Sequence, residues 1–558
     1  MTALQRLREE DFLTRLRKKD PSLWSQDPRD QAIIQNRLGW VTVHRSIQAS
    51  IGEMLEVAGW VRELDFQRVV LIGMGGSSLA PEVFQRTFGA APGFPDLIVL
   101  DSTDPMAVAR VENRIEIETT LFIISSKSGT TIETASLQRY FEERMWDATG
   151  DIASLDNFIA ITDPDTPLHH QAIEDGYHKV FVNPPDVGGR YSALSFFGLV
   201  PAAAIGVDVE RLLRESEALN WEEAVELGAR LGDLALQGQD KVTFLHGDGL
   251  ESFGAWAEQL LAESTGKQGE GLIPVDGEPI GALSAYGEDR VFVYLDAGER
   301  SSATQQALER LKAEGHPVIA TRIDDPYELG REFLCWEVAT AAAGAVLGIN
   351  PFDEPNVQES KDNTRRVLEG YVRSGRMPQG GPDICEDVLD LHLTRAAAES
   401  LREADERTIA GLVAAHLGKG SPPHYAAVVA YIAPSEEHDR LLTRLRVAVR
   451  DATMMATTVG YGPRFLHSTG QLHKGGPATG IFLQITTDDA TDEDIPGETG
   501  FGFSALKQAQ ALGDLEALGS RGLPVVRVHL RGDTTSSLRR LVDTVEAALV
   551  PLSVAGRE

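Results

Sequence analysis

Short apolar runs alternate with longer, helix-periodic segments along most of this chain, and this alternation constrains the fold more than any other feature. Apolar strands joined by helices predict a parallel sheet that is covered by helices on both faces. Ligands of such sheets bind at the carboxyl ends of the strands. The first unit of this kind contains five runs: VVLI (Val69 to Ile72), DLIVL (Asp96 to Leu100), LFII (Leu121 to Ile124), FIAI (Phe158 to Ile161) and KVFV (Lys179 to Val182).

The same alternation returns twice in the rest of the chain. Each later unit has a long helix after its first strand, a glycine-bearing loop before its second, and helices on both sides of its third. We interpret the third unit as a diverged repeat of the second. The strands are KVTFL (Lys241 to Leu245), VFVYL (Val291 to Leu295) and VIAT (Val318 to Thr321) in the second unit, and AAVVAYI (Ala426 to Ile432), IFLQI (Ile481 to Ile485) and VVRVHL (Val525 to Leu530) in the third.

The predicted fold is therefore α/β, with tandem doubly wound parallel sheets. The segments GGP and GKGSPP flank a helix-rich stretch between the second and third units, as expected of a linker region. The expected segments are an N-terminal helical part (1–60), a first α/β domain (61–220), a second (221–370), a helical linker region (371–423) and a third α/β unit (424–558).

Charge and cysteine content exclude several classes of partner. The 558 residues carry a formal net charge of −32, which disfavours nucleic acids and anionic membranes as partners. Cys335 and Cys385 make neither a disulfide framework nor a cysteine-based metal site. Residues 1–20 are charged and helix-periodic without the apolar core of a signal peptide, and the apolar runs are too short to span a membrane. We expect a cytoplasmic protein of two to four domains.

The segment SSKSGTTIET (Ser125 to Thr134) directly follows the third apolar run and opens a helix. Its hydroxyls, free backbone N–H groups and positive helix end could together hold one phosphate group. The chain contains no nucleotide P-loop of the form G-x-x-x-x-G-K-[ST], so the predicted ligand is a phosphomonoester. An ordinary helix cap rich in Ser and Thr would look similar.

Two other glycine-rich loops could approach an anion. GMGGSSL (Gly73 to Leu79) follows the first strand and opens a helix, but Ser78 stands where a dinucleotide-binding fingerprint has its last glycine. VGGRYS (Val187 to Ser192) places Arg190 behind two glycines, where its guanidinium could reach an oxyanion. A tight strand-helix turn and a solvated arginine are the simpler explanations.

Three ionisable residues are candidates for acid–base chemistry. Glu263 lies in the last turn of an apolar helix that ends QLLAESTGK, where the helix dipole and burial would both raise its pKa. Lys361 ends the segment FDEPNVQESK, and His467 lies in RFLHSTGQ between an apolar pair and a hydroxyl-rich turn. Taken singly, a surface glutamate, a solvated lysine and a structural histidine are all commoner.

Together these six segments resemble the phosphoglucose isomerase family across about residues 60 to 500, and most closely the isomerase portion of bifunctional transaldolase/phosphoglucose isomerases. The blocks S-K-S-G-T-T-x-E-T, G-G-R-Y-S, Q-x-x-x-E-S-x-G-K and F-D-x-P-x-V-x-x-x-K are specific and occur in the family's order. The resemblance implies tandem sugar-isomerase (SIS-type) units, a sugar-phosphate substrate, and no metal or redox cofactor.

The resemblance also implies a role for each motif residue. Glu263 would be the base, Arg190 would stabilise the enediolate, and Lys361 with His467 would assist ring opening. The residues expected to hold the substrate are Gly75, Gly76, Ser77, Ser126, Lys127, Ser128, Thr131, Gln259 and Glu354.

Two departures from the family pattern stand out. Glu354 replaces the Gln that many members have, which would add a negative charge beside the sugar. The L-H-S-x-G-Q segment follows Lys361 instead of preceding it, and the stretch GALSAYG after Glu263 lacks the histidine. We infer that duplication left Glu263 in the second unit and His467 in the third. His467 should reach the cleft of Glu263 within one chain or across a homodimer interface; otherwise Lys361 or another histidine, such as His473, must open the ring.

The predicted reaction is the reversible isomerisation of glucose 6-phosphate and fructose 6-phosphate. Glu263 would move a proton between C2 and C1 through a cis-enediol. One alternative is a sugar-phosphate-binding regulator without turnover, against which the joint presence of Glu263, Arg190 and Lys361 argues. Another is an isomerase that also accepts mannose 6-phosphate.

Overall fold

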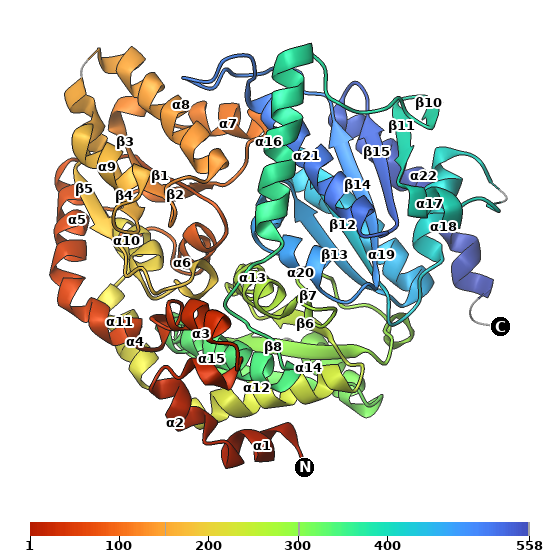
Figure 1. Cartoon of the computed structure of the whole chain (residues 1–558), viewed down its shortest axis with the longest axis horizontal. Coiled ribbons are helices and arrows are strands. Elements are labelled where there is room, and N and C mark those ends of the chain that lie inside the picture. The colour runs from red at the N-terminus through yellow and green to blue at the C-terminus, as the bar shows by residue number, and fades with distance from the viewer. Residues whose placement is uncertain (151, 299–301, 405, 556–558) are drawn as a thin grey trace.

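Three sheets organise the computed structural model of this chain, which describes residues 1–150, 152–298, 302–404 and 406–555. In Figure 1 the first sheet lies at the upper left, the second below and the third on the right. The first is fully parallel in the order β2-β1-β3-β4-β5, as predicted. Its strands are β1 (Arg68–Gly73), β2 (Asp96–Leu100), β3 (Thr120–Ser125), β4 (Phe158–Thr162) and β5 (Lys179–Val182).

Both faces of the first sheet are buried, which explains why its strands are continuously apolar. Val69 and Leu71 of β1 pack into the core beneath α5, α6 and α10. Val70 and Ile72 pack into the opposite core, with α7, α8 and α9. These helices are α5 (Ile51–Glu63), α6 (Leu79–Phe88), α7 (Pro105–Glu112), α8 (Ile132–Thr149), α9 (Pro167–Glu174) and α10 (Phe196–Ala204).

The second sheet has four parallel strands in the order β7-β6-β8-β9. Its strands are β6 (Lys241–His246), β7 (Ile273–Val275), β8 (Arg290–Ala297) and β9 (Val318–Ile323). The short edge strand β7 lies outside the three predicted runs. The surrounding helices are α11 (Val209–Glu217), α12 (Trp221–Leu236), α13 (Phe253–Thr265), α14 (Ser302–Ala313) and α15 (Leu329–Leu347).

The third sheet has six strands in the order β10-β11-β15-β14-β12-β13. Four are parallel: β12 (Tyr425–Tyr431), β13 (Ala456–Tyr461), β14 (Gly480–Thr487) and β15 (Val525–Leu530). Its other elements are β10 (Ile384–Glu386), β11 (Leu389–Leu393), α16 (Val357–Ser374), α17 (Arg395–Ser400), α18 (Ile409–Gly418), α19 (Glu436–Thr453), α20 (Gly470–Gly475), α21 (Phe503–Ser520) and α22 (Thr534–Ala555).

The stretch 371–423, expected to be a helical linker, also contains strands. β10 and β11 form an antiparallel hairpin, and β11 pairs with β15, so the hairpin extends the third sheet. The sequence of β11, LDLHL, alternates apolar and polar residues in the period of a half-buried strand. This alternation could have predicted the strand, but it was not recognised in the sequence. α16, which begins inside the expected second domain, packs against α21 of the third unit instead.

The second and third units share one topology, which agrees with the predicted repeat. The order β7-β6-β8-β9 corresponds strand for strand to β13-β12-β14-β15. The packing between the units is also reciprocal: α13 contacts α20, which precedes β14, and α19 contacts the short helix Leu283–Ala285, which precedes β8. In each unit, the helix after the first strand (α13 or α19) therefore contacts the segment that precedes the second long strand (β14 or β8) of the other unit.

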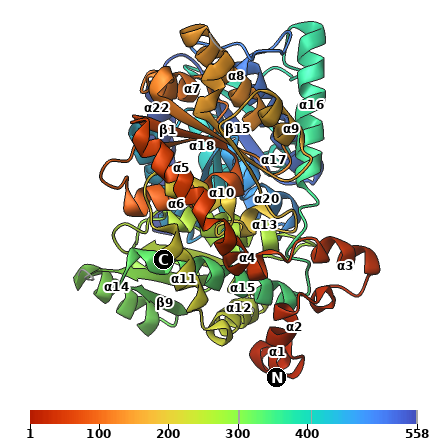
Figure 2. The same ribbon diagram turned by 90° about the vertical axis from the view of Figure 1, so that its left-hand side faces the viewer.

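The N-terminal part is helical, as predicted, and packs mainly on the second unit. Figure 2 shows α1 and α2 at the base of the molecule, near α12. The Trp24 indole donates a hydrogen bond to the carbonyl of Ala341 in α15 at 2.8 Å. The helices before α5 are α1 (Ala3–Glu9), α2 (Phe12–Arg17), α3 (Pro28–Gln35) and α4 (Trp40–Ser46).

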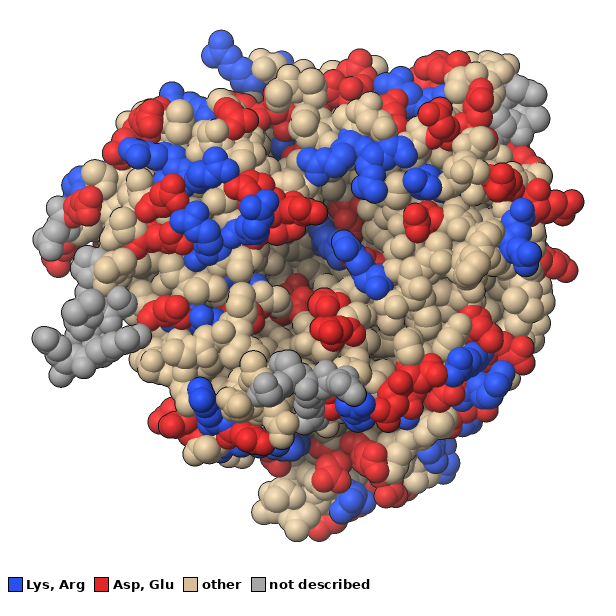
Figure 3. Space-filling view, turned by 180° about the vertical axis from the view of Figure 1, so that it is seen from behind, with Lys and Arg blue, Asp and Glu red and all other residues tan. Residues whose placement is uncertain are grey.

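Surface charges are mixed rather than gathered into one basic patch on the face drawn in Figure 3. That face is hollowed near its centre. Among the described residues, no helix combines the length and apolar character that crossing a bilayer requires.

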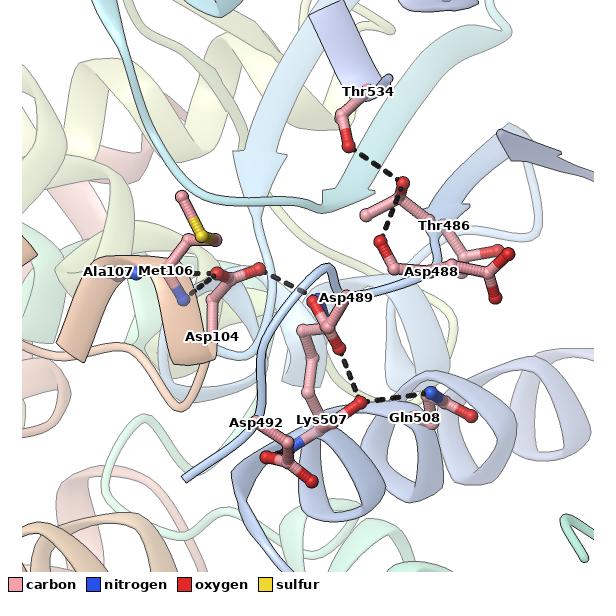
Figure 4. A network of polar contacts seen from close by, with 12 residues as sticks. Asp104, Met106, Ala107, Thr486, Asp488, Asp489, Asp492, Lys507, Gln508 and Thr534 are labelled. Carbon is pink, nitrogen blue, oxygen red and sulfur yellow. Dashed lines mark hydrogen bonds and ion pairs between the residues drawn. The ribbon is translucent and has the colours of Figure 1, made fainter. Parts of the chain in front are cut away.

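A buried lysine forms ion pairs that link the third unit to the first. Lys507 of α21 pairs with Asp104, which caps α7, at 2.8 Å, and with Asp489 in the loop after β14. Figure 4 shows these groups facing one another. The three side chains are 1–3% exposed, so each charge depends on its partners for compensation.

We expect Lys507→Met to lower the free energy of unfolding by roughly 3–5 kcal/mol, because two carboxylates would remain buried without their cation. Urea-induced unfolding followed by fluorescence measures the loss. Lys312→Met, on the exposed face of α14, is the matched control. Equal unfolding midpoints for the two variants would contradict a stabilising role for Lys507.

Candidate active site

The candidate site lies where the strand order of the first sheet changes direction. β1 has β2 on one side and β3 on the other, so the loops after β1 and β3 diverge and leave a crevice at their carboxyl ends. Gly73 and Ser125 are paired neighbours at these strand ends. The crevice is therefore bordered by the GMGGSS loop and the predicted phosphate loop, as the sequence indicates.

The phosphate loop offers hydroxyls directly before a helix. Ser126 is buried, and its hydroxyl lies 3.4 Å from that of Thr131. Thr131 precedes α8 without making a side-chain cap, so the first-turn amide groups of α8 can bind an anion. Gly129 has a φ of 63°, the left-handed conformation that glycine adopts without strain. The hydroxyl of Ser128 accepts a hydrogen bond from the backbone N–H of Thr130.

Lys127 is less free than the sequence suggests. Its ammonium forms an ion pair with Asp163 and donates to the carbonyl of Pro185 at 3.0 Å. Burial lowers the pKa of Lys127. Before it could contact a phosphate, Lys127 would have to release or share these partners.

The glycines after β1 bring three units of the chain together. A side chain at Gly75 would collide with the amide of Gln259 at 2.6 Å and with the carbonyl oxygen of His467 at 2.7 Å. A side chain at Gly76 would collide with the carbonyl oxygen of Gly189 at 2.0 Å. This loop, which also carries the buried Ser77, therefore needs glycine for close packing beside the Arg190 block.

Arg190 is buried and held by several groups. Its guanidinium donates to the Ser264 hydroxyl at 2.9 Å and to the carbonyl oxygens of Pro351 at 2.7 Å and Asp353 at 2.9 Å. It also pairs with Glu354 at 3.1 Å. The extra negative charge that Glu354 was expected to add beside the sugar is thus compensated by Arg190.

Glu263 lies 3.6 Å from the Arg190 guanidinium and is 12% exposed. Burial raises the pKa of Glu263, whereas Arg190 partly opposes this rise. The Gln259 amide, one turn earlier on α13, lies 3.3 Å from the Glu263 carboxylate and donates to the carbonyl of His467 at 2.7 Å. A shielded carboxylate of raised pKa beside a fixed cation suits proton transfer next to a carbonyl group.

His467 reaches this region from the third unit of the same chain. Its ring Nε2 lies 2.8 Å from a carboxylate oxygen of Glu133, and the amide of Gln510 donates to that same oxygen at 2.6 Å. Burial alone would lower the pKa of His467, but Glu133 outweighs burial and raises it. Glu133 in turn has a lowered pKa, because His467 outweighs the effect of burial. The pair favours a charged imidazolium.

Glu133 and Gln510 are the residues that sequence reasoning missed. Glu133 belongs to the SSKSGTTIET motif, but the sequence interval of 334 residues to His467 hides their contact. His473, the substitute histidine, is buried among the rings of Tyr425, Phe465 and Phe482. Burial lowers the pKa of His473 to about 3, so it is a poor proton donor at neutral pH.

Lys361 lies near the start of α16 and borders the same cavity as His467. The structure thus brings Glu263, His467 and Lys361 to one region from a single chain, with Arg190 fixed beside Glu263. Among the described residues, no three His, Cys, Asp or Glu side chains form a group suited to holding a metal ion.

Comparison with known proteins matches part of this chain to the phosphoglucose isomerases. A sequence model of the phosphoglucose isomerase family matches residues 44–226, which contain both loops of the crevice and Arg190. The glucose-6-phosphate isomerase of Rubrobacter xylanophilus is 31% identical over 376 residues, covering 58% of this chain and 86% of that protein. This chain belongs to the phosphoglucose isomerase family. The glucose-6-phosphate isomerase of Carboxydothermus hydrogenoformans is 29% identical over 407 residues, covering 60% of this chain and 86% of that protein.

One solved structure has a similar fold. A hypothetical protein from Thermus thermophilus superimposes with a TM-score of 0.53 at 24% identity, covering 66% of this chain and 96% of that one. At this identity the similarity concerns the fold alone. The three matched proteins cover 58%, 60% and 66% of this chain, so this phosphoglucose isomerase family member extends beyond the part that each of them shares.

Proposed function

We propose that the chain catalyses the reversible isomerisation of glucose 6-phosphate and fructose 6-phosphate. The observation that carries the proposal is the convergence of Glu263 and His467, from two units, on the glycine loop of the first unit. Family membership supports an aldose-ketose isomerase, and both relatives named above are glucose-6-phosphate isomerases. A regulator that only binds the sugar phosphate would need the phosphate loop but not the buried Glu263–Arg190 pair.

Each step has a candidate group. The hydroxyls of Ser126, Ser128 and Thr131 hold the phosphate at the start of α8. The imidazolium of His467, assisted by Lys361, protonates the ring oxygen as the ring opens. The carboxylate of Glu263 then removes the proton from C2 of the open aldose and returns it to C1, while the O2 hydroxyl proton moves to O1, which yields the ketose.

Arg190 stabilises the negative charge that develops on the enediolate oxygens between these two proton transfers. Because its other donors are already bonded, the guanidinium is preorganised and needs little movement during the reaction. The proton transfers require no redox cofactor and no metal. A cytoplasmic location belongs to the same proposal and is supported by a chain with two separate free cysteines.

A coupled assay that starts from fructose 6-phosphate tests the proposal. We expect glucose 6-phosphate to form at the same rate with and without a chelator. No product above the uncatalysed rate, or complete loss with the chelator, would contradict it. Conversion of mannose 6-phosphate at a comparable rate would identify the dual isomerase instead.

The phosphate loop should act mainly through binding. We expect Ser126→Ala combined with Thr131→Ala to raise the KM for fructose 6-phosphate at least tenfold, because each hydrogen bond to a charged group contributes about 1.5–3 kcal/mol. Steady-state kinetics measures the change. Thr544→Ala, whose hydroxyl bonds to its own helix in α22, is the control. An unchanged KM in the double variant would overturn the phosphate assignment.

Glu133 should set the pH range in which His467 carries a proton. We expect Glu133→Gln to lower the pKa of His467, because burial then acts without the opposing carboxylate. Activity on the cyclic sugar, which needs the protonated imidazole, should therefore be lost at lower pH than in the unmodified enzyme. The pH profile of kcat measures this, with Gln508→Ala on α21 as the control. A profile with an unmoved alkaline limb would contradict the coupling.

A further inference from the structure

The cavity that Lys361 shares with His467 extends away from Glu263. It has a volume of about 570 Å³ and lies between α16, the start of α8 and the loop before α21. Figure 1 shows α16 between the first and third units. Glu133, His467 and Gln510 form one end of it. Among the described residues, the lining includes neither Glu263 nor Arg190, but it does include Thr130 of the phosphate loop, so the cavity adjoins the crevice described above on the side of His467 and Lys361.

One face of α16 supplies a wall that is both apolar and basic. Lys361, Arg365, Leu368 and Val372 follow one another at intervals of four, three and four residues, which places them on one side of a helix. α16 also packs against α21, where Arg366 pairs with Glu516. Leu368 belongs to the buried core that α16 shares with α8 and α21, whereas Lys361, Arg365 and Val372 are exposed.

The facing wall contributes three apolar side chains beside its polar ones. They are Ile132 at the start of α8, Leu466 beside the catalytic histidine, and Phe501 in the loop before α21. Val372 is 48% exposed, so its side chain is accessible from the cavity. A mostly apolar cavity of this volume with a few polar groups is typical of small-molecule sites.

The unpaired charge of the cavity is positive, although the chain as a whole carries −32. Among the described residues, Lys361 and Arg373 have no ion-pair partner, and Arg365 has only Asp362 at 3.9 Å. Two of the acids are already compensated: Glu498 pairs with Arg139 at 2.8 Å, and Glu133 pairs with His467 at 2.8 Å. Glu369 alone opposes the three cations of α16.

We propose that this cavity binds a small organic anion with an apolar or aromatic body, such as an aryl carboxylate, sulfonate or phosphate. The body packs between Phe501 and the aliphatic side chains of α16, and the anionic group pairs with Arg365 and Arg373. A sugar phosphate lacks the apolar face that these walls would bury. Because the ligand lies against Lys361 and His467, its presence slows ring opening; this last consequence rests on the proposed function.

Binding is tested without substrate, so its outcome is independent of the isomerase assignment. The probe is 1-anilinonaphthalene-8-sulfonate, titrated by fluorescence beside its uncharged analogue N-phenyl-1-naphthylamine. We expect one sulfonate bound per chain, and the analogue bound at least about tenfold more weakly because it cannot pair with the arginines.

Three variants locate the site. Arg365→Glu combined with Arg373→Glu should weaken binding of the sulfonate at least about tenfold and bring it near that of the uncharged analogue. Val372→Trp should fill the cavity and weaken binding of both probes. Arg366→Glu, the same charge change at an arginine of α16 that does not line the cavity, should leave both unchanged. Binding that is absent in the unmodified protein, indifferent to the probe's charge, or equal in all variants would overturn the proposal.

Discussion

Replacing Glu263 by Gln is expected to remove most of the turnover while leaving ligand binding nearly intact. The substitution preserves the shape of the side chain but deletes the base, and general acid–base catalysis typically contributes about 10²–10⁴-fold. We expect kcat for fructose 6-phosphate to fall by this amount. The affinity for a sugar-phosphate inhibitor should change little, because the phosphate loop is untouched.

The same helix offers a matched control. Glu258 lies on α13 too, and burial, aided by Asp276, raises its pKa to about 8. Glu258→Gln therefore makes the same chemical change at a second shielded carboxyl group, without removing the proposed base. Exchange of deuterium from heavy water into C1 or C2 reports the proton transfer directly. Exchange at the unmodified rate in Glu263→Gln, or an equal loss in Glu258→Gln, would show that another group is the base.

Replacing His467 by Ala is expected to cause the second largest loss of turnover, and to cause it mainly for the cyclic sugar. Turnover of the cyclic sugar should fall about 10²–10⁴-fold, because protonation of the ring oxygen is lost. Turnover of an open-chain analogue should fall far less, because that substrate needs no ring opening. Parallel assays of the two substrates measure the difference.

His424→Ala is the control for this experiment, since His424 is an exposed histidine of the same unit. Equal losses on both substrates in His467→Ala would indicate that the histidine stabilises the site as a whole rather than opening the ring. In that case Lys361 would be the remaining candidate for ring opening.

Much of the fold could be predicted because local patterns determine it. The continuous apolar runs at β1 and β3 predict strands buried on both faces, and both strands form the centre of the first sheet. The hairpin of β10 and β11 was missed, because a five-residue alternation is a weak pattern beside the glycines and prolines that precede it. Its pairing with β15 depends on residues far away in the sequence.

The roles of the site residues remain predictions. Two of these residues, Glu263 and Arg190, lie 3.6 Å apart, as the motifs imply. The sequence could not show that Lys127 is paired with Asp163, or that Glu133 is paired with His467, because spacing in the chain says nothing about long-range contacts. It also left open whether His467 reaches Glu263 within one chain. The hydrogen bond from Gln259 to the carbonyl of His467 brings the two elements together in a single chain, and the role of His467 there stays a prediction.

A mixing experiment tests most directly whether one chain builds a complete site. Glu263→Gln and His467→Ala protein are coexpressed, purified together and assayed with fructose 6-phosphate beside each variant alone. If both residues act within the same chain, the mixture should show only the average of the two residual activities. Activity in the mixture well above that of either variant would mean that His467 of one chain serves Glu263 of another, which would contradict the single-chain site.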